Sequence, residues 1–520
     1  VIIILIVLFL LLLALAIGMT VLCKYHLLIL LDNSYKRTAK VTNITDAAIY
    51  VCGNWAEDHP RPDAYRSYDW FRDKQSKVYA TVRDFLSQNS TEQPRPVRQA
   101  REMYAACMDT GNDLINKIGL RPVLKVLKSV GLPLFPTYIN VTENFDYSIY
   151  TFDWLEAVIK IKVELGMDVL IGFDIFTDPK NSSVYRLVMG SPETTNPFPR
   201  SLDVFDCKSV PKHHKNKAEL ILSFDAYNLI FQIDSNNDTE NDDLNLSIPE
   251  YTVNEIQAHT DMIVKNNNGT VISIWKRYLE GVFKISKVSL DFDKDKILVS
   301  DPDLKYMALM ATMVSRLPPV TIELYIWIKV TEVLAIHTTT EMRALFQRTY
   351  EQLHIGKATA APARSLQCAS AVNDMLGMAV SYGIADPHFV NVTKPKVINF
   401  TFNSRLVGKA KWMDDDTKLA TYQKIIQMKT LVGFPDWLLE EGKLERYYDG
   451  LEVNIGTHLE NMINIVQVKI KKALNRFRDG NNFTWATDPT EVNAYHTFQE
   501  NTITVPLVML QHPFFDLGLE

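Results

Sequence analysis

The chain has 520 residues and a formal net charge of −6, and 47% of its residues are hydrophobic while 22% are charged. This composition is typical of globular proteins and excludes a disordered or collagen-like chain, and a mildly acidic chain without a basic block is a poor nucleic-acid binder. Five cysteines are too few for a small disulfide-stabilised scaffold.

The chain opens with an apolar segment. Residues 1–22 carry no charge and are almost wholly apolar. A helix that spans a bilayer needs ~20 such residues, whereas the apolar core of a cleaved signal peptide is shorter, at ~7–15 residues. The length predicts a transmembrane signal anchor over 1–22, and residues 23–50 are interpreted as a juxtamembrane stalk. Basic residues follow the segment, and a basic flank usually stays cytoplasmic.

Glycosylation motifs argue for the opposite side of the membrane. Ten N-x-S/T motifs are spread through the chain, and each is a candidate acceptor although the motif is short. They are Asn43, Asn89, Asn140, Asn181, Asn237, Asn245, Asn268, Asn391, Asn399 and Asn482. Ten such motifs fit an ectodomain of the secretory pathway better than a cytosolic domain. We therefore expect residues 23–520 to be extracellular or lumenal, at the plasma membrane.

Beyond the stalk, the apolar spacing is mostly helical. A period of three to four residues begins near Phe71, and stop signals such as Gly166 and Gly433-Phe-Pro435 end individual segments. The predicted helices are 98–108, 114–130, 154–165, 253–265, 302–316, 320–337, 340–354, 368–382, 414–431 and 459–477. The acidic, polar tract 234–245 is predicted to be a solvated loop, since it lacks the glycine and the final glutamate of a calcium-binding loop.

Strands are expected in two places. Residues 168–175 and 184–189 flank a turn at 178–181 and predict a hairpin. Residues 492–495 and 502–505 predict a two-stranded ribbon, followed by an apolar run. We expect six apolar residues here to be partly exposed: Val505, Leu507, Val508, Leu510, Phe514 and Phe515. The fold class is therefore a large, mainly α ectodomain with a few short strands.

Five short blocks, in this order and spacing, resemble one known family. They are Cys52-Gly-Asn-Trp55, the Tyr104 to Cys107 helix, Cys368-Ala-Ser-Ala-Val-Asn373, Trp412-Met-Asp414 with 432–436, and Val492-Asn-Ala-Tyr495 with 510–515. The chain resembles the neprilysin and endothelin-converting-enzyme family of membrane zinc endopeptidases over roughly residues 50–520. The resemblance implies a type II membrane protein with a two-lobed, mainly helical ectodomain enclosing a cavity for peptides.

The resemblance also implies a domain division, site residues and partners. Residues 51–480 correspond to the helical peptidase-family domain, and 481–520 to the start of a thermolysin-like catalytic domain. Within it, Asn493, Ala494 and Tyr495 are implied to form a substrate-binding edge strand, which can bind an extended peptide as an added strand. Cys107 and Cys368 are implied to form a disulfide. Short extracellular peptides and the membrane are the implied partners, and homodimerisation is left open.

The zinc motif of that family is missing from the printed sequence. Zinc peptidases of this type hold the metal with two histidines one helical turn apart, and none of the eleven histidines is followed by glutamate. His337 and Glu341 are four residues apart, yet an exposed polar pair is the better interpretation, and His213-His214 is interpreted as solvated surface. We therefore expect no metal and no catalytic residue in these residues, although the family's cofactor is zinc.

Two functional hypotheses remain open from the sequence. The first is a membrane-anchored zinc metalloendopeptidase, represented by a fragment that stops before the zinc helix and is inactive as given. The second is a catalytically inactive homologue that binds peptides as a receptor or decoy. Both hypotheses use the same edge strand, and they differ in whether a bound peptide is cleaved.

Overall fold

The computed structural model describes residues 68–88, 92–109, 113–140, 149–193, 196–199, 248–353, 363–385, 405–481 and 487–515, with isolated residues between them. Two compact units are separated, Val1–Tyr68 and Asp69–Glu520, and the description below concerns the second. The predicted anchor at 1–22, the stalk and the 234–245 tract lie outside the described residues. None of the described helices combines the length and the apolar character needed to cross a bilayer.

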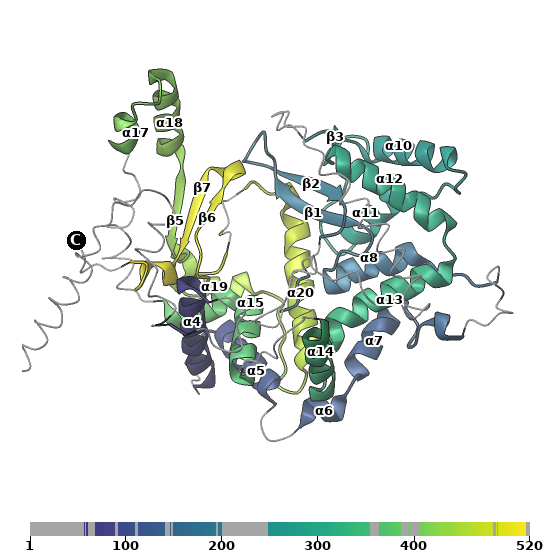
Figure 1. The fold of residues 1–520 in the computed structure, drawn as a ribbon, viewed down its shortest axis with the longest axis horizontal. Helices are drawn as coiled ribbons and strands as arrows, with labels where there is room; N and C mark the ends of the chain where they lie inside the picture. Colours follow the sequence, from purple (N-terminus) through teal and green to yellow (C-terminus); the bar gives the residue numbers. More distant parts are fainter. Residues whose placement is uncertain are drawn as a thin grey trace, which may run out of the picture. The chain divides into compact units, whose positions relative to one another are not determined.

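Helices make up most of the described structure, as Figure 1 shows. They are α4 (Trp70–Ser87), α5 (Arg95–Met108), α6 (Leu114–Ile118), α7 (Arg121–Ser129), α8 (Trp154–Leu165), α10 (Val253–Asn266), α11 (Trp275–Phe283), α12 (Asp301–Arg316), α13 (Pro319–Ala335), α14 (Thr340–Leu353), α15 (Arg364–Ile384), α17 (Arg405–Lys409), α18 (Asp415–Gln427), α19 (Lys443–Tyr447) and α20 (His458–Asn475). The predicted mainly helical fold class is confirmed.

Local signals explain where α8 begins and ends. The Asp153 side chain caps the first turn by accepting a hydrogen bond from the Glu156 backbone N–H at 3.1 Å. Gly166 ends the helix with a positive φ of 66°, where a residue without Cβ is favoured. The predicted helix 154–165 therefore has the same bounds in the structure.

The helices pack into groups that α20 connects. α15 contacts both α4 and α5, while α8 contacts α11 and α13. α20 contacts α8 as well as α5 and α15, so it joins the two groups (Figure 1). Large, fully buried side chains such as Trp275, Tyr278 and Met103 belong to one continuous hydrophobic core. The sequence analysis did not predict α11, which carries two of these three residues.

The first sheet contains the predicted hairpin. β1 (Gly172–Thr177) pairs antiparallel with β2 (Tyr185–Gly190), so that Gly172 faces Gly190. β2 also pairs in parallel with β4 (Ile297–Leu298), which pairs with β3 (Glu250–Tyr251). The hairpin prediction is confirmed with shifted bounds, and β3 and β4 are additions that only long-range pairing creates.

The second sheet corrects one prediction and extends another. β5 (Lys429–Gly433) pairs in parallel with β7 (Thr502–Pro506), and β7 pairs antiparallel with β6 (Tyr495–Thr497), in the order β5-β7-β6. The predicted helix 414–431 is wrong at its end, because its last residues extend to pair with β7. The predicted pairing of the two ribbon strands is confirmed between β6 and β7, and β5 adds a third strand that was not predicted.

Two further predictions are corrected. The predicted helix 114–130 is broken into α6 and α7, because Gly119 adopts a φ of 65° and Pro122 lies in the first turn of α7. In the last apolar run, Leu507 and Val508 are buried rather than partly exposed, with 4% and 2% of their surface accessible. They lie in a short 3-10 helix (Leu507–Leu510) that contacts β5 and β7. The other four residues of that prediction are partly exposed as expected: Val505, Leu510, Phe514 and Phe515.

Candidate substrate edge and its surroundings

The predicted substrate residues lie where the chain enters β6. Asn493 and Ala494 precede β6 and are exposed, whereas Tyr495 is the first residue of the strand and pairs with Thr504 of β7. The prediction that 492–495 forms a strand is therefore wrong except for Tyr495. In the sheet as described, β6 pairs on one side only, so it is an edge strand that can accept a further strand.

The Asn493 side chain is engaged locally. Its Oδ1 accepts a hydrogen bond from the Ala494 backbone N–H at 2.9 Å, and its Nδ2 donates to the Tyr495 hydroxyl at 3.4 Å. The Tyr495 hydroxyl lies 3.3 Å from Glu491 Oε1, and burial together with that carboxylate raises the pKa of Tyr495. A peptide that hydrogen-bonds to Asn493 therefore has to replace the contact with Ala494.

A single glutamine on α4 fixes the backbone ahead of this edge. Gln75 Oε1 accepts from the Val492 N–H at 2.8 Å, and Gln75 Nε2 donates to the Thr490 carbonyl at 3.2 Å. The Val492 side chain between these contacts is buried in the core. This clamp places Asn493 and Ala494 immediately after a rigid point. Nothing in the sequence indicated it, because the two segments are 415 to 417 residues apart.

Other contacts tie α4 to the last described segment. The rings of Phe71 and Phe514 have centroids 4.8 Å apart, and Lys74 Nζ donates to Gln511 Oε1 at 2.9 Å. Burial, with the neighbouring charge of Lys77, lowers the pKa of Lys74. The first described helix and the segment after β7 therefore form one structural support for the edge.

Carboxylates with raised pKa values lie close to the same edge. Desolvation by its surroundings, followed by the charges of Glu491 and Asp488, raises the pKa of Asp374 on α15 to about 7, while part of the residue stays exposed to solvent. Burial raises the pKa of Asp488 to about 6, against the opposing charge of Lys469 on α20. A side chain at Gly377 would collide with the Asp488 carboxyl, so Gly377 makes this approach possible. These carboxyls can hold or release a proton near neutral pH.

The described residues do not form a metal site. Among them, no group of three or more His, Cys, Asp or Glu side chains is placed to hold a metal ion. The donor set of the described residues therefore does not fit the zinc of the family. His337 follows α13 and Glu341 lies in α14, so the two do not share one helix. His337 is half-buried and contacts the Phe198 ring, which corrects its interpretation as exposed; residues 213–214 lie outside the described part.

The cysteine pair implied by the resemblance is joined in the structure. Cys107 of α5 and Cys368 of α15 form a disulfide, with Cα atoms 5.7 Å apart and 261 residues of sequence separation. Both cysteines are almost completely buried. The bond fixes α15 to α5, and thereby holds one side of the structure that supports the edge. Cys23, Cys52 and Cys207 lie outside the described residues.

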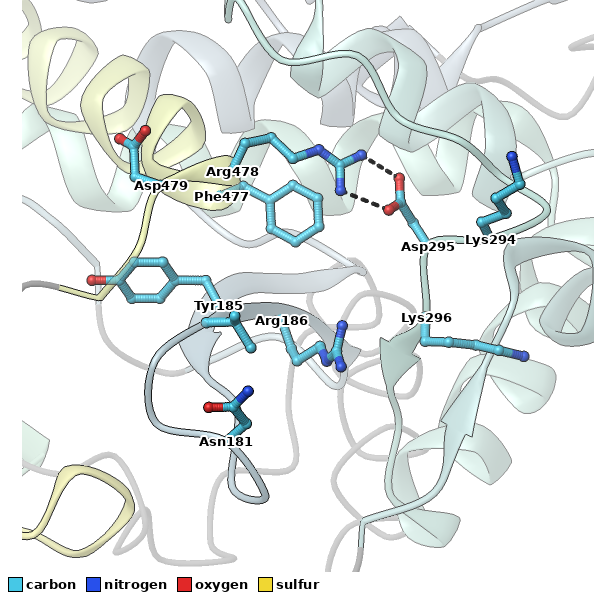
Figure 2. A pocket seen from close by; sticks show the side chains of 10 residues that line it. Asn181, Tyr185, Arg186, Lys294, Asp295, Lys296, Phe477, Arg478 and Asp479 are labelled. Atoms are coloured by element: carbon cyan, nitrogen blue, oxygen red, sulfur yellow. Dashed lines mark hydrogen bonds and ion pairs between the residues drawn. The ribbon is translucent and has the colours of Figure 1, made fainter.

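A separate pocket lies beside the β1–β2 turn, as Figure 2 shows. Its volume is about 340 Å³, and charged residues dominate its lining. Arg478 forms a bidentate pair with Asp295, and Arg186 pairs with Asp178 at 2.7 Å. Because these cations are neutralised locally, the pocket offers little unpaired charge to a ligand. Asn181, an exposed candidate for glycosylation, lines the pocket.

Comparison with known proteins identifies the family. The model for "Peptidase family M13" matches residues 45–435. An endothelin-converting enzyme homolog of Locusta migratoria is 23% identical over 493 residues, covering 90% of this chain and 65% of the relative. Neprilysin of Mus musculus is 24% identical over 512 residues, covering 92% of this chain and 66% of the relative. The chain therefore spans about two thirds of the length of these relatives.

Solved structures share the fold. The Mycobacterium tuberculosis zinc metalloprotease ZMP1, determined in complex with an inhibitor, superposes with a TM-score of 0.65 over 91% of this chain and 69% of its own, at 16% identity. PepO from Lactobacillus rhamnosis gives a TM-score of 0.62 over 91% of this chain and 72% of its own, at 14% identity. Since the family model covers most of the chain, the chain belongs to peptidase family M13, a family of zinc metallopeptidases.

Proposed function

We propose that this chain supplies the peptide-holding part of a neprilysin-like zinc metalloendopeptidase that degrades or processes short extracellular peptides. The observation that carries the proposal is the edge strand β6, preceded by the exposed Asn493 and Ala494 and fixed by Gln75. Family membership supports the peptidase activity, and the geometry supports the role of this segment in holding a substrate.

The edge binds a peptide through backbone contacts in this proposal. An extended peptide lies beside β6 and pairs with its outward N–H and C=O groups, which recognise any sequence. The Asn493 carboxamide turns from the Ala494 N–H to the substrate backbone, because an amide offers both a donor and an acceptor. The side chains of the peptide alternate above and below the sheet, so the pockets on either face determine which peptide side chains are preferred.

We further propose that the protein is a single-pass type II protein of the plasma membrane, anchored by residues 1–22 with its ectodomain outside the cell. The apolar run and the glycosylation motifs of the sequence support this topology. Among the described motifs, Asn181 and Asn268 have exposed side chains, as a glycan acceptor requires.

Kinetics on the protein as cells produce it test the enzyme hypothesis. Asn493→Ala should lower kcat/KM for a short peptide about tenfold, since it removes one or two hydrogen bonds to the substrate backbone. The matched control is Asn254→Ala on α10, whose side chain contacts Asp293 far along the chain from the edge. Equal kcat/KM values for the two variants would show that Asn493 does not bind the substrate.

The same assay separates the two hypotheses. A peptidase cleaves the peptide, with products that begin at hydrophobic residues. A peptide-binding or decoy homologue binds it at the edge without cleavage. If the intact protein neither binds nor cleaves the peptide, both functional hypotheses are refuted.

A further inference from the structure

Four basic side chains lie at the ends of four helices, and contacts bring three of these ends to residues 107–116. Arg364 donates to the Cys107 carbonyl, the Thr340 N–H in the same turn as Arg343 donates to Asn116 Oδ1 at 2.8 Å, and Gly456, two residues before His458, lies against Leu114. His337 follows α13, Arg343 lies in the first turn of α14, Arg364 begins α15 and His458 begins α20. Their charges act on one another: burial and then the charges of Arg364 and Arg343 lower the pKa of His337 to about 4, and the same guanidinium groups act on His458. This basic cluster is distinct from the substrate edge.

Neither guanidinium in the basic cluster is neutralised by a carboxylate. Arg343 donates to the Thr338 carbonyl at 2.5 Å and to Thr340 Oγ1 at 3.0 Å, and Arg364 donates to the Cys107 carbonyl at 2.8 Å. All three acceptors are uncharged, and the described residues place no carboxylate within ion-pair distance of either arginine. Burial and the charge of Arg343 lower the pKa of Arg364 to about 10, which still leaves it protonated at neutral pH.

The carboxylate with the greatest influence on the basic cluster is already occupied. Asp109 acts on both arginines through its charge. However, its Oδ1 accepts from the Leu114 N–H at 2.9 Å and its Oδ2 from the Ile115 N–H at 2.7 Å. The adjoining stretches 110–112 and 354–362, whose structure is not described, contain no Asp or Glu in the sequence. These two stretches therefore add no carboxylate to the basic cluster.

A buried polar atom and two helix ends point to a missing partner. His458 is only 6% exposed, and its Nδ1 has no hydrogen-bond partner among the described residues. The first turns of α15 and α20 have no side-chain cap, since Ala363 cannot provide one and Thr457 does not. Uncapped N–H groups give both helix ends partial positive charge, which favours an anion.

We propose that a small monovalent anion binds in the basic cluster, between Arg364, Arg343 and the Nδ1 edge of His458. Asp109 is the carboxylate whose charge acts on both guanidinium groups, so one of their two positive charges remains, and a chloride ion or a compact carboxylate neutralises it. Leaving buried charge unpaired is costly, and an anion removes that cost. Arg364 is half-buried, so an ion can reach it from solvent.

Chloride-35 NMR of the full chain in detergent tests the proposal. Chloride bound at a protein site relaxes rapidly, so the chloride line should broaden in proportion to protein and saturate as chloride increases at constant ionic strength. Acetate should reverse the broadening if the site accepts carboxylates, whereas phosphate should compete weakly. Thermal unfolding with chloride replacing gluconate should show a saturable rise in Tm.

Matched variants decide the location. Arg364→Gln and, from another helix, Arg343→Gln should each abolish the saturable broadening and the rise in Tm. Arg348→Gln removes one exposed charge from α14, the helix that also carries Arg343, and should change neither. The proposal is overturned if the unmodified chain shows no saturable broadening, or if folded Arg364→Gln and Arg343→Gln chains both retain it. The test does not involve peptide binding, so its outcome is independent of the proposed function.

Discussion

Gln75 is the residue through which α4 fixes the backbone ahead of the substrate edge. Replacing it with methionine preserves side-chain volume and removes both hydrogen bonds, at 2.8 Å to the Val492 N–H and 3.2 Å to the Thr490 carbonyl. Each such bond contributes ~1 kcal/mol net, so local opening should become easier by ~2 kcal/mol. That corresponds to an opening population about 30-fold larger.

Hydrogen exchange measures this opening directly. In Gln75→Met, the Val492 amide should exchange about 30-fold faster than in the unmodified chain, provided that reclosing is fast compared with exchange. The control is Gln423→Met on α18, where the glutamine is exposed and no helix residue is buried. Exchange at Val492 in Gln75→Met within about threefold of the unmodified rate would refute the reasoning, because such a change is below the contribution of one hydrogen bond.

Three further perturbations follow from the described contacts. Cys368→Ala removes the disulfide to Cys107, which closes a loop with a sequence separation of 261 residues. The chain-entropy model predicts that the free energy of unfolding falls by about 5 kcal/mol, which is measured as a lower urea midpoint. An unchanged midpoint would contradict this prediction. Glu323→Gln should destabilise the fold by about 2 kcal/mol. The reason is that the fully buried Glu323 carboxylate accepts hydrogen bonds from the Thr137 N–H at 2.8 Å and from the Thr137 hydroxyl at 2.9 Å. Calorimetry that shows no loss of stability would argue against a stabilising role for these hydrogen bonds. Burial raises the pKa of Asp488 to about 6, so its stabilising effect is complete below the unfolded value of 3.8 and is lost as pH rises through 6. Asp488→Asn should therefore flatten the stability profile between pH 4 and 7, and an unaltered profile would exclude this carboxyl as its cause.

Features set by local sequence were predictable. The bounds of α8 follow from the capping Asp153 and from Gly166, and the β1–β2 hairpin follows from a turn between two apolar runs. The motif blocks that carried the resemblance correctly led to the family, and to the pairing of Cys107 with Cys368. In each case the signal lay within a few residues or within a recognised block.

Features set by distant partners were not predictable. Residues 429–431 continue the apolar spacing of the preceding helix, yet they form the start of β5 because β7 lies beside them. The Gln75 clamp depends on residues more than 400 positions away, so no local pattern indicates it. The raised pKa of Asp374 likewise depends on desolvation by the folded surroundings and on the charges of Glu491 and Asp488, which lie far from it in the sequence.

The most direct test of the account is amide exchange across the edge with and without peptide. A short extracellular-type peptide, made resistant to hydrolysis, is added to the intact protein, and exchange is followed at residues 494–497. Our account predicts slower exchange at these amides, because the peptide adds a strand beside β6 and Asn493 changes its partner. Binding of the peptide without protection of β6, or with protection confined to another region, would contradict it.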